Sequence, residues 1–173
     1  MRRIGVDPGA RRTGLAFAEP DVRIAYPLKT IEHRGYEQAA LMVAAEVSSA
    51  NAQQVVIGLP LRSDGSEGEA ARSVRRFAAM VEASSTVPVV LWDERLSTAA
   101  AERHLSSARI FGKKRRSVVD QAAATLILQS YLDAIGKSAW VEEEILQIGP
   151  AVKSDRRRRG RSAGEKRWRE RRK

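Results

Sequence analysis

The sequence predicts an α/β fold with one mixed five-stranded sheet and helices packed on it. Three observations lead to this prediction. Three strand-like segments follow the N-terminus without a helix between them, two later apolar segments alternate with helical ones, and a long helical segment comes after the last strand. Strands joined directly tend to pair antiparallel, whereas strands joined through a helix pair parallel. The sheet should therefore be antiparallel over its first three strands and parallel afterwards.

The first three strands are predicted from residue alternation and turn residues. Ile4 and Val6 are β-branched and alternate with smaller residues, which predicts a strand ending near Asp7. Residues 8–12, Pro-Gly-Ala-Arg-Arg, have the composition of a turn. Because Asp and Pro are also favoured at the first two positions of a β-turn, Asp7 has a purely structural explanation as well. We expect the second and third strands at residues 13–18 and 22–31.

The remaining elements alternate between helices and buried strands. Apolar residues at helical spacing predict helices, and continuous apolar runs predict strands that are buried on both faces. Ser66 with Glu69, and Ser117 with Asp120, stand in the register of helix-capping pairs. The expected helices cover residues 36–50, 66–83, 97–107 and 117–135. The expected strands cover residues 52–60 and 87–92, and residues 139–149 suit a strand or a helix.

This order of elements is that of the ribonuclease H-like fold. In that fold the first strand lies centrally in the sheet, and we expect the strands at 52–60 and 87–92 beside it. Ligands of such sheets bind at the carboxyl ends of the parallel strands. Residues that follow those strands are therefore the first candidates for a functional site.

The positive charge is concentrated at the C-terminus. The chain has 173 residues, with 31 Lys or Arg, 21 Asp or Glu and a formal net charge of +10. Residues 150–173 hold 12 of the basic and 3 of the acidic residues, so residues 1–149 are close to neutral. A segment so charged and so poor in aliphatic residues cannot fold alone. We expect one folded domain at 1–149 and a basic, disordered tail at 150–173.

The composition also excludes several classes of protein. There is no cysteine, which excludes disulfides, thiolate metal sites and cysteine nucleophiles. No apolar run approaches the roughly 18 residues that span a bilayer. The first strand begins almost at once, which leaves no room for a signal peptide. We therefore expect a cytoplasmic protein without a membrane partner.

Three acidic residues stand at element ends that the predicted fold brings together. Asp7 ends the first strand, Glu94 follows the strand at 87–92, and Asp120 lies in the first turn of the helix at 117–135. A carboxylate cluster without His or Cys prefers Mg²⁺ or Mn²⁺ to zinc. Two such ions about 3.5–4 Å apart activate a water and stabilise the leaving oxygen of a phosphodiester. We predict these three residues as metal ligands and catalytic residues of a phosphodiester hydrolase.

Each of these acids also has a structural explanation. Asp120 can cap its own helix, and Glu94 can be an exposed residue that is ion-paired with a neighbouring arginine. Only their joint placement with Asp7 favours a site, because no spacing motif links them. The small residues at 122–124 would let their helix approach the sheet closely.

Basic residues around these acids suit contact with phosphate groups. They lie on the first turn, beside Glu94 and just before the last helix, and the tail adds arginines with a Trp that can stack on a base. Such a tail can also be a solubilising extension. The predicted nucleic-acid contacts are Arg11, Arg12, Arg95, Lys113, Lys114, Arg115, Arg116, Arg156, Arg157, Arg158, Arg159 and Trp168.

The loop after the strand at 52–60 holds accessory candidates. This loop follows the carboxyl end of the strand and contains Asp64, Ser66 and Glu67. The N-terminus of the next helix can bind a phosphate there, or the two acids can assist a metal. His33 and His104 are isolated, and we assign no chemistry to them.

Four segments carry a resemblance to a known family. In order they are GVDPGARRTGLAFA, VVIGLPLRSDGSEG, DERLST and VVDQAAATLILQSYL, and the similarity covers roughly residues 3–133. They resemble the sequence blocks of the YqgF/RuvX family, a ribonuclease H-like bacterial family described as Holliday-junction resolvases and as pre-16S rRNA nucleases. The resemblance implies a metal-dependent nuclease with Asp7, Glu94 and Asp120 at the family's acidic positions. Pro8 and Thr13 depart from the usual residues, and the tail lies outside the resemblance.

Three functions are open at this point. The leading one is an Mg²⁺- or Mn²⁺-dependent nuclease acting on structured nucleic acid, either the 5′ end of pre-16S rRNA in ribosome biogenesis or branched DNA in recombination and repair. Symmetric cutting of a junction needs a homodimer, whereas a monomer favours RNA. The alternative is a non-catalytic nucleic-acid-binding protein that uses the basic tail on a nuclease-like core. A kinase of the actin-like superfamily opens with a similar turn but needs two lobes.

Overall fold

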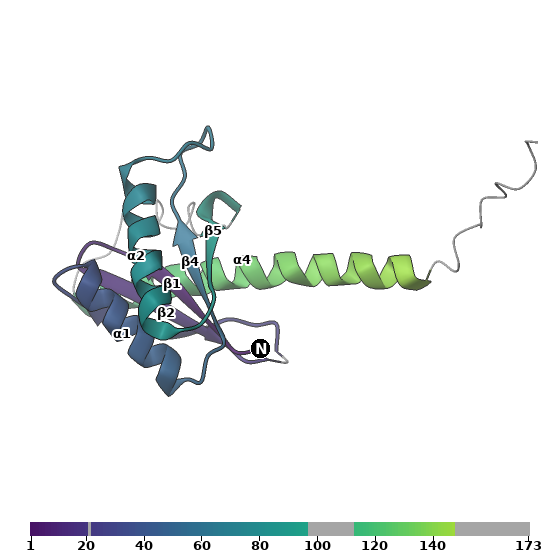
Figure 1. The fold of residues 1–173 in the computed structure, drawn as a ribbon, viewed down its shortest axis with the longest axis horizontal. Coiled ribbons are helices and arrows are strands. Elements are labelled where there is room, and N and C mark those ends of the chain that lie inside the picture. Colours follow the sequence, from purple (N-terminus) through teal and green to yellow (C-terminus); the bar gives the residue numbers. More distant parts are fainter. Residues whose placement is uncertain (21, 97–112, 148–173) are drawn as a thin grey trace, which may run out of the picture. The chain divides into compact units, whose positions relative to one another are not determined.

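The computed structural model describes residues 1–20, 22–96 and 113–147 (Figure 1). For residues 96, 113–116 and 137–147 it describes the backbone only. Met1–Ala139 forms one compact unit and Trp140–Lys173 forms another. The sheet and the helices on it belong to the first unit. The predicted helix at 97–107 and the predicted tail lie outside the described residues, so the domain boundary expected after residue 149 stays a prediction.

The first unit is built on a mixed five-stranded sheet with the strand order β3-β2-β1-β4-β5. The strands are β1 (Arg3–Pro8), β2 (Arg12–Ala18), β3 (Tyr26–Glu32), β4 (Gln54–Leu59) and β5 (Val89–Asp93). The β1–β2 and β2–β3 pairs are antiparallel, and the β1–β4 and β4–β5 pairs are parallel. The predicted mixed sheet with its antiparallel start is confirmed.

One expectation about the strand order is wrong. β1 lies centrally and pairs with β4, but β5 lies beside β4 at the edge of the sheet and not beside β1. The reason is that β2 and β4 already occupy the two sides of β1. A residue after β5 must therefore reach across β4 to approach the end of β1.

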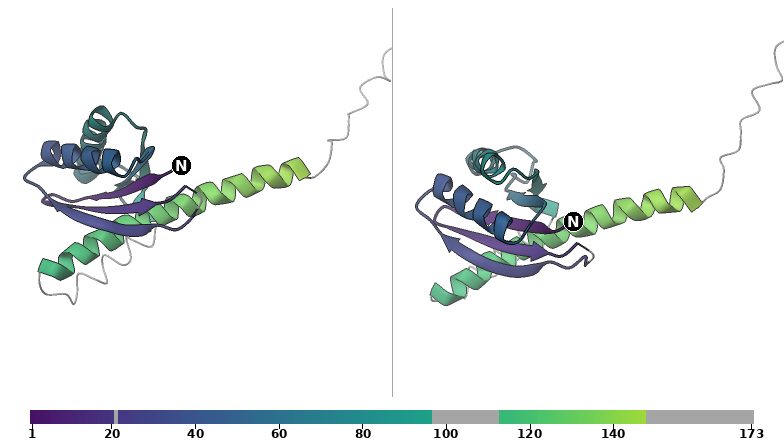
Figure 2. Two further views of the ribbon diagram at one scale, coloured as in Figure 1. Left: turned by 90° about the horizontal axis from the view of Figure 1, so that it is seen from below. Right: turned by 60° about the horizontal axis from the view of Figure 1, so that its bottom comes forward.

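Helices cover both faces of the sheet, as Figure 2 shows. They are α1 (Tyr36–Ser49), α2 (Glu69–Ser85), the short 3₁₀ helix η1 (Glu94–Leu96) and α4 (Lys113–Gln147). α1 and α2 pack on the face that carries Ile4 and Val6, and α4 packs through Ala124 and Leu128 on the opposite face. None of the described helices is long and apolar enough to cross a membrane.

α4 lies close to the sheet because the strands carry small residues on that face. A Cβ atom at Gly5 would lie 2.6 Å from the Cβ of Leu128, and a Cβ at Gly14 would overlap the backbone of Asp120. Ala16 is fully buried on the same face. The expected close approach is thus confirmed, but the strands contribute to it as much as the alanines of the helix.

Both predicted helix-capping pairs are wrong. α2 begins at Glu69 with Gly68 as its N-cap residue and no side-chain cap, and the backbone N–H of Ser66 donates to Oδ1 of Asp64 instead. α4 begins at Lys113, so Ser117 and Asp120 lie inside the helix and not at its start. Lys and Arg have good helix propensity, which lets the helix begin within the basic segment. The ambiguous stretch after residue 139 is helical up to Gln147.

Candidate active site at the carboxyl end of β1

Asp7 lies at the carboxyl end of the central strand with a glycine on each side. Its register partner on β2 is Gly14. On β4, Ile57 is the partner of Val6, so the next residue, Gly58, is the neighbour of Asp7 on that side. Register neighbours point to the same face of a sheet. Asp7 therefore projects on the α4 face between two positions that carry no side chain.

The glycine on β4 makes room for Glu94. A Cβ at Gly58 would clash with Oε1 of Glu94 and would lie 2.6 Å from Cδ1 of Ile127. Glu94 is 6% exposed, so it is not the exposed residue of the structural explanation. It belongs to η1, directly after β5, and reaches across to β4. A buried carboxylate is costly without a compensating charge or hydrogen bonds.

The glycine on β2 makes room for Asp120. The carbonyl group of Asp120 lies over Gly14, and the Asp120 Cα is 3.2 Å from the Cβ position of that glycine. This brings the third predicted acid, from the N-terminal part of α4, to the other side of Asp7. The structure thus assembles residues from β1, η1 and α4 at neighbouring positions of one sheet face.

The carboxylate of Asp120 is paired with Arg12. Nε of Arg12 lies 2.9 Å from Oδ2 of Asp120, with 31% and 22% of the two side chains exposed. This oxygen is buried and makes no hydrogen bond of regular geometry, so the contact is an ion pair. Burial raises the pKa of Asp120, and the charge of Arg12 offsets only part of that effect. A bound divalent cation would favour the charged form further.

Several known proteins are similar in sequence to this chain. The sequence model of RuvX, described as "Holliday junction resolvase", matches residues 1–134. The chain belongs to the RuvX family. A relative from Syntrophus aciditrophicus (strain SB) is 42% identical over 137 residues, which cover 79% of this chain and 91% of that one. One from Thermobifida fusca (strain YX) is 41% identical over 156 residues, 86% and 97% of the two chains. Both relatives are named "Putative pre-16S rRNA nuclease".

A solved structure shares the fold of this RuvX-family chain. Thermus thermophilus RuvC in complex with a Holliday junction substrate superposes with a TM-score of 0.52 over 79% of this chain and 96% of that one. The sequences are 16% identical, so the likeness concerns the fold alone. It agrees with the ribonuclease H-like architecture expected from the order of elements.

The three acids of this RuvX-family chain offer the type of ligand atom that a divalent cation prefers, but their side chains do not converge on one binding position. The donors are carboxylate oxygens only, the type that Mg²⁺ and Mn²⁺ prefer, and Oδ2 of Asp120 is a buried acceptor. Among the residues that the structure describes, however, no three His, Cys, Asp or Glu side chains form a group that could hold an ion. The three candidate ligands thus occupy neighbouring positions without forming a closed metal site. The carboxylate of Asp120 is instead paired with the guanidinium of Arg12.

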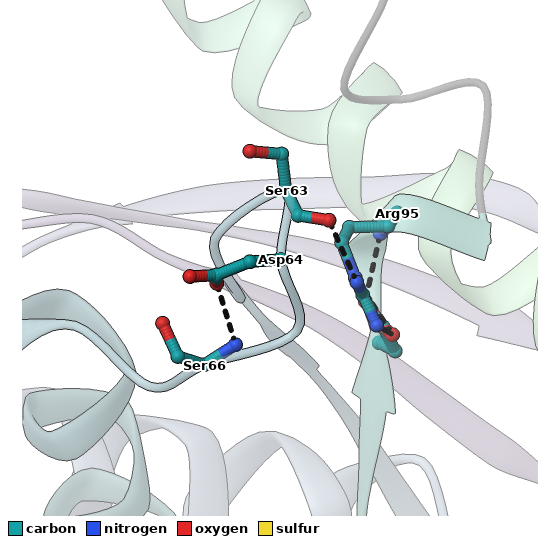
Figure 3. A network of polar contacts seen from close by, with 5 residues as sticks. Ser63, Asp64, Ser66 and Arg95 are labelled. Carbon is teal, nitrogen blue, oxygen red and sulfur yellow. Dashed lines mark hydrogen bonds and ion pairs between the residues drawn. The ribbon is translucent and has the colours of Figure 1, made fainter.

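The accessory acids of the 60–68 loop are already engaged with groups of the protein. Oδ1 of Asp64 accepts the Ser66 N–H at 2.9 Å (Figure 3). Hydrogen bonding with the Ser66 side chain first, and then with this N–H, lowers the pKa of Asp64. Glu67 is ion-paired with Arg75 of α2, which lowers the pKa of Glu67. Their assistance to a metal, and phosphate binding at Ser66, stay predictions.

Arg95 braces this loop against the end of β5. Its guanidinium is ion-paired with Asp93 at 2.7 Å and donates to the carbonyl oxygen of Ser63 at 3.3 Å (Figure 3). The side chain is 40% exposed, so contact with nucleic acid stays a prediction.

The other predicted contacts lie partly outside the described side chains. Arg11 is exposed on the β1–β2 turn, next to the ion-paired Arg12. Of Lys113, Lys114, Arg115 and Arg116 only the backbone is described, and it forms the first turn of α4. The tail candidates Arg156, Arg157, Arg158, Arg159 and Trp168 lie outside the described residues.

His33 and Thr13 form a buried pair near this edge of the sheet. The hydroxyl of Thr13 and Nε2 of His33 are 3.0 Å apart, and burial lowers the pKa of His33. Thr13 is one of the positions that depart from the family's usual residue, and its hydroxyl has this partner.

Sequence reasoning missed the residues that allow the acids to meet. Gly14 and Gly58 lie inside strands, where glycine is disfavoured unless another group approaches closely. That signal was present in the segments RTGLA and VVIGL.

Proposed function

We propose that the chain is a divalent-metal-dependent nuclease that hydrolyses phosphodiester bonds in structured nucleic acid. The observation that carries the proposal is the placement of Glu94 and Asp120 over the two glycines that flank Asp7. The three acids come from distant parts of the chain and lie at neighbouring positions on one face of the sheet. Close carboxylates in a partly buried site are stabilised by a cation.

The chain's own residues have distinct roles in this proposal. Asp7, Glu94 and Asp120 would hold Mg²⁺ or Mn²⁺, whose charge would help to activate a water and to stabilise the leaving oxygen. The buried position of Glu94 keeps bulk water away from one side of the site. Arg11 is exposed on the turn beside Asp7 and contacts a phosphate of the substrate.

Two substrates remain in competition. The names of the relatives from Syntrophus and Thermobifida favour pre-16S rRNA, whose processing belongs to ribosome biogenesis. The description of the matching family favours Holliday-junction DNA and hence recombination and repair. We propose the precursor rRNA as the first substrate to test, with the protein acting in the cytoplasm as a monomer or a homodimer.

The test is a substrate panel with a matched pair of variants. Pre-16S rRNA, a four-way DNA junction and single-stranded DNA are each incubated with Mg²⁺, Mn²⁺ or EDTA. Asp120→Asn should lower the cleavage rate about 100-fold or more, because a metal ligand is removed. Asp133→Asn is the control, since Asp133 lies exposed on the same helix and accepts a hydrogen bond from Gln129.

The outcomes separate the two classes of function. Cleavage that requires a metal and is abolished only in Asp120→Asn supports the nuclease. Binding without cleavage of any substrate, with either metal, contradicts it and indicates the non-catalytic binding protein instead.

We also propose that the basic tail binds phosphate groups without sequence preference. Deleting residues 150–173 should weaken binding to all three nucleic acids. It should also reduce the slope of log affinity against log salt by about 0.7–0.9 for each phosphate group that the tail neutralises. An unchanged slope would show that the tail makes no contact with the phosphate groups. The measurement is a salt titration of binding by fluorescence anisotropy in EDTA.

A further inference from the structure

Two consecutive arginines on the β1–β2 turn have different surroundings. Arg11 is exposed and, within the described part of the chain, makes no ion pair with a carboxylate. Arg12 directs its Nε atom to Oδ2 of Asp120 at 2.9 Å. The hydrogen bond from the Gly9 N–H to the Arg12 carbonyl oxygen, 2.9 Å long, fixes this arginine's backbone at the end of the hairpin.

The acids around Asp7 need a positive charge whether or not a metal is present. Glu94 is 6% exposed and the Asp120 side chain is 22% exposed, so water screens both poorly. Neighbouring carboxylates in such a place repel each other, and burial adds a desolvation cost. In the described structure the guanidinium of Arg12 supplies the positive charge at Asp120.

Arg12 and a divalent cation would compete for the same oxygen. Oδ2 of Asp120 is buried, and its only ion-pair partner among the described residues is Arg12. The same residues contain no group of three acids that could hold an ion. The ion pair and the missing group of three acids have one explanation if Arg12 holds the Asp120 side chain away from the other two acids.

We propose that Arg12 is the counterion of Asp120 in the metal-free protein. When Mg²⁺ or Mn²⁺ binds to the Asp120 carboxylate, the ion pair breaks, and Arg12 then contacts a phosphate of the nucleic acid. Arg12 is thus a positioning residue for Asp120 in one state and a substrate contact in the other. The phosphate contact rests on the proposed nuclease function. The competition with the metal does not, because it concerns the protein without substrate.

The first experiment measures Mn²⁺ binding to the full chain by isothermal titration calorimetry without substrate. Arg12→Gln should bind Mn²⁺ about five-fold more tightly than Arg11→Gln, because a partly buried ion pair no longer opposes the metal. The two variants remove the same charge from adjacent residues, so long-range electrostatics is matched. Equal affinities within two-fold would overturn the proposal.

A double-mutant cycle tests whether the effect passes through Asp120. In an Asp120→Asn background, Arg12→Gln should change the Mn²⁺ affinity no more than Arg11→Gln does. A persistent five-fold difference would mean that Arg12 acts elsewhere, which contradicts the proposal. Circular dichroism confirms folding, and Arg12→Lys, which keeps the charge, gives an affinity closer to the unchanged protein if Arg12→Gln is unstable.

The second experiment measures steady-state kinetics at saturating Mn²⁺. Arg12→Gln should raise KM about ten-fold, since the guanidinium no longer donates charge-assisted hydrogen bonds to phosphate, while its affinity for the metal rises. A merely structural arginine would lower stability without these opposite changes. If the unchanged protein cuts no substrate, the nuclease proposal fails and the calorimetry still decides the competition. If it cuts but the calorimetry shows no difference, the Arg12 proposal alone fails.

Discussion

The two faces of the sheet differ in the size of their residues near the end of β1. Under α1 and α2, large side chains such as Leu15, Ile57 and Phe77 are fully buried in one apolar layer. Under α4, the strands instead present Gly14 and Gly58 next to the end of β1, and the acids lie over them. The α4 face also buries an apolar cluster, which includes Ile127, Leu128 and Leu132. Next to the end of β1, however, it gives up side-chain volume and lets charged groups approach. Both faces thus stabilise the fold, and the α4 face also holds the acids.

The same contrast holds for two arginine–aspartate pairs. Asp93 is the register partner of Leu59, whose side chain belongs to the α1/α2 layer, and the Arg95 guanidinium lowers the pKa of Asp93. Asp120 faces the sheet from α4, and burial raises its pKa despite Arg12. A pair that lowers the aspartate's pKa stabilises the folded state, whereas a raised pKa marks a carboxylate that the fold tolerates at a cost. That cost suggests a role other than stability.

The largest expected effect tests the apolar face. Phe77→Ala should lower the free energy of unfolding by about 4 kcal/mol, because it leaves a cavity in a fully buried layer. The Mn²⁺ affinity of the folded protein should not change, since Phe77 lies on the opposite face from the acids. Urea unfolding and calorimetry measure the two quantities. A loss of metal affinity in protein that is still folded would show that the two faces are not independent.

The next effect tests the small residues of the α4 face. Gly14→Ala should cost about 3 kcal/mol, because its Cβ overlaps backbone atoms of Asp120 that cannot move without shifting α4. Unlike Phe77→Ala, it should also abolish Mn²⁺ binding. Gly35→Ala is the matched control, since its Cβ would meet only the flexible Glu37 carboxylate at 3.3 Å. Retained metal affinity in Gly14→Ala would contradict the role assigned to this glycine.

The sequence could predict those features that depend on neighbours along the chain. The alternation around Ile4 and the turn after Asp7 are local, so the hairpin and the strand-end acid were expected. The edge position of β5 and the burial of Glu94 depend on β4, which lies far away in sequence. The start of α4 at Lys113 was missed because basic residues form a helix without a recognisable cap. Local patterns thus indicate which acids end the elements, and only tertiary packing determines their partners.

The pH dependence of stability sharpens the comparison between the two pairs. Asp120 has a raised pKa in the folded state, so its contribution is fully present below the ordinary value of 3.8 and is lost as the pH rises through the raised pKa. Asp120→Asn should therefore be more stable than the unchanged protein at pH 7, by less than about 1 kcal/mol after solvent screening. The advantage should disappear in acid. Urea unfolding from pH 3 to 7 without metal measures it.

The smallest effect should have the opposite sign. Arg95 lowers the pKa of Asp93, so the pair's stabilisation is present above 3.8 and is lost as the pH falls through the lowered pKa. Asp93→Asn should therefore be slightly less stable than the unchanged protein at pH 7 and equal to it in strong acid. The effect is small because solvent reaches the Arg95 side chain, which is 40% exposed. Curves of the same sign for Asp93→Asn and Asp120→Asn would contradict the separation of a structural pair from a tolerated one. Opposite signs in one chain would support it without any substrate or metal, because both aspartates have an arginine partner and similar exposure, 19% for Asp93 and 22% for Asp120. They differ in that Asp93 accepts several hydrogen bonds from Arg95, whereas the contact of Asp120 with Arg12 is an ion pair alone.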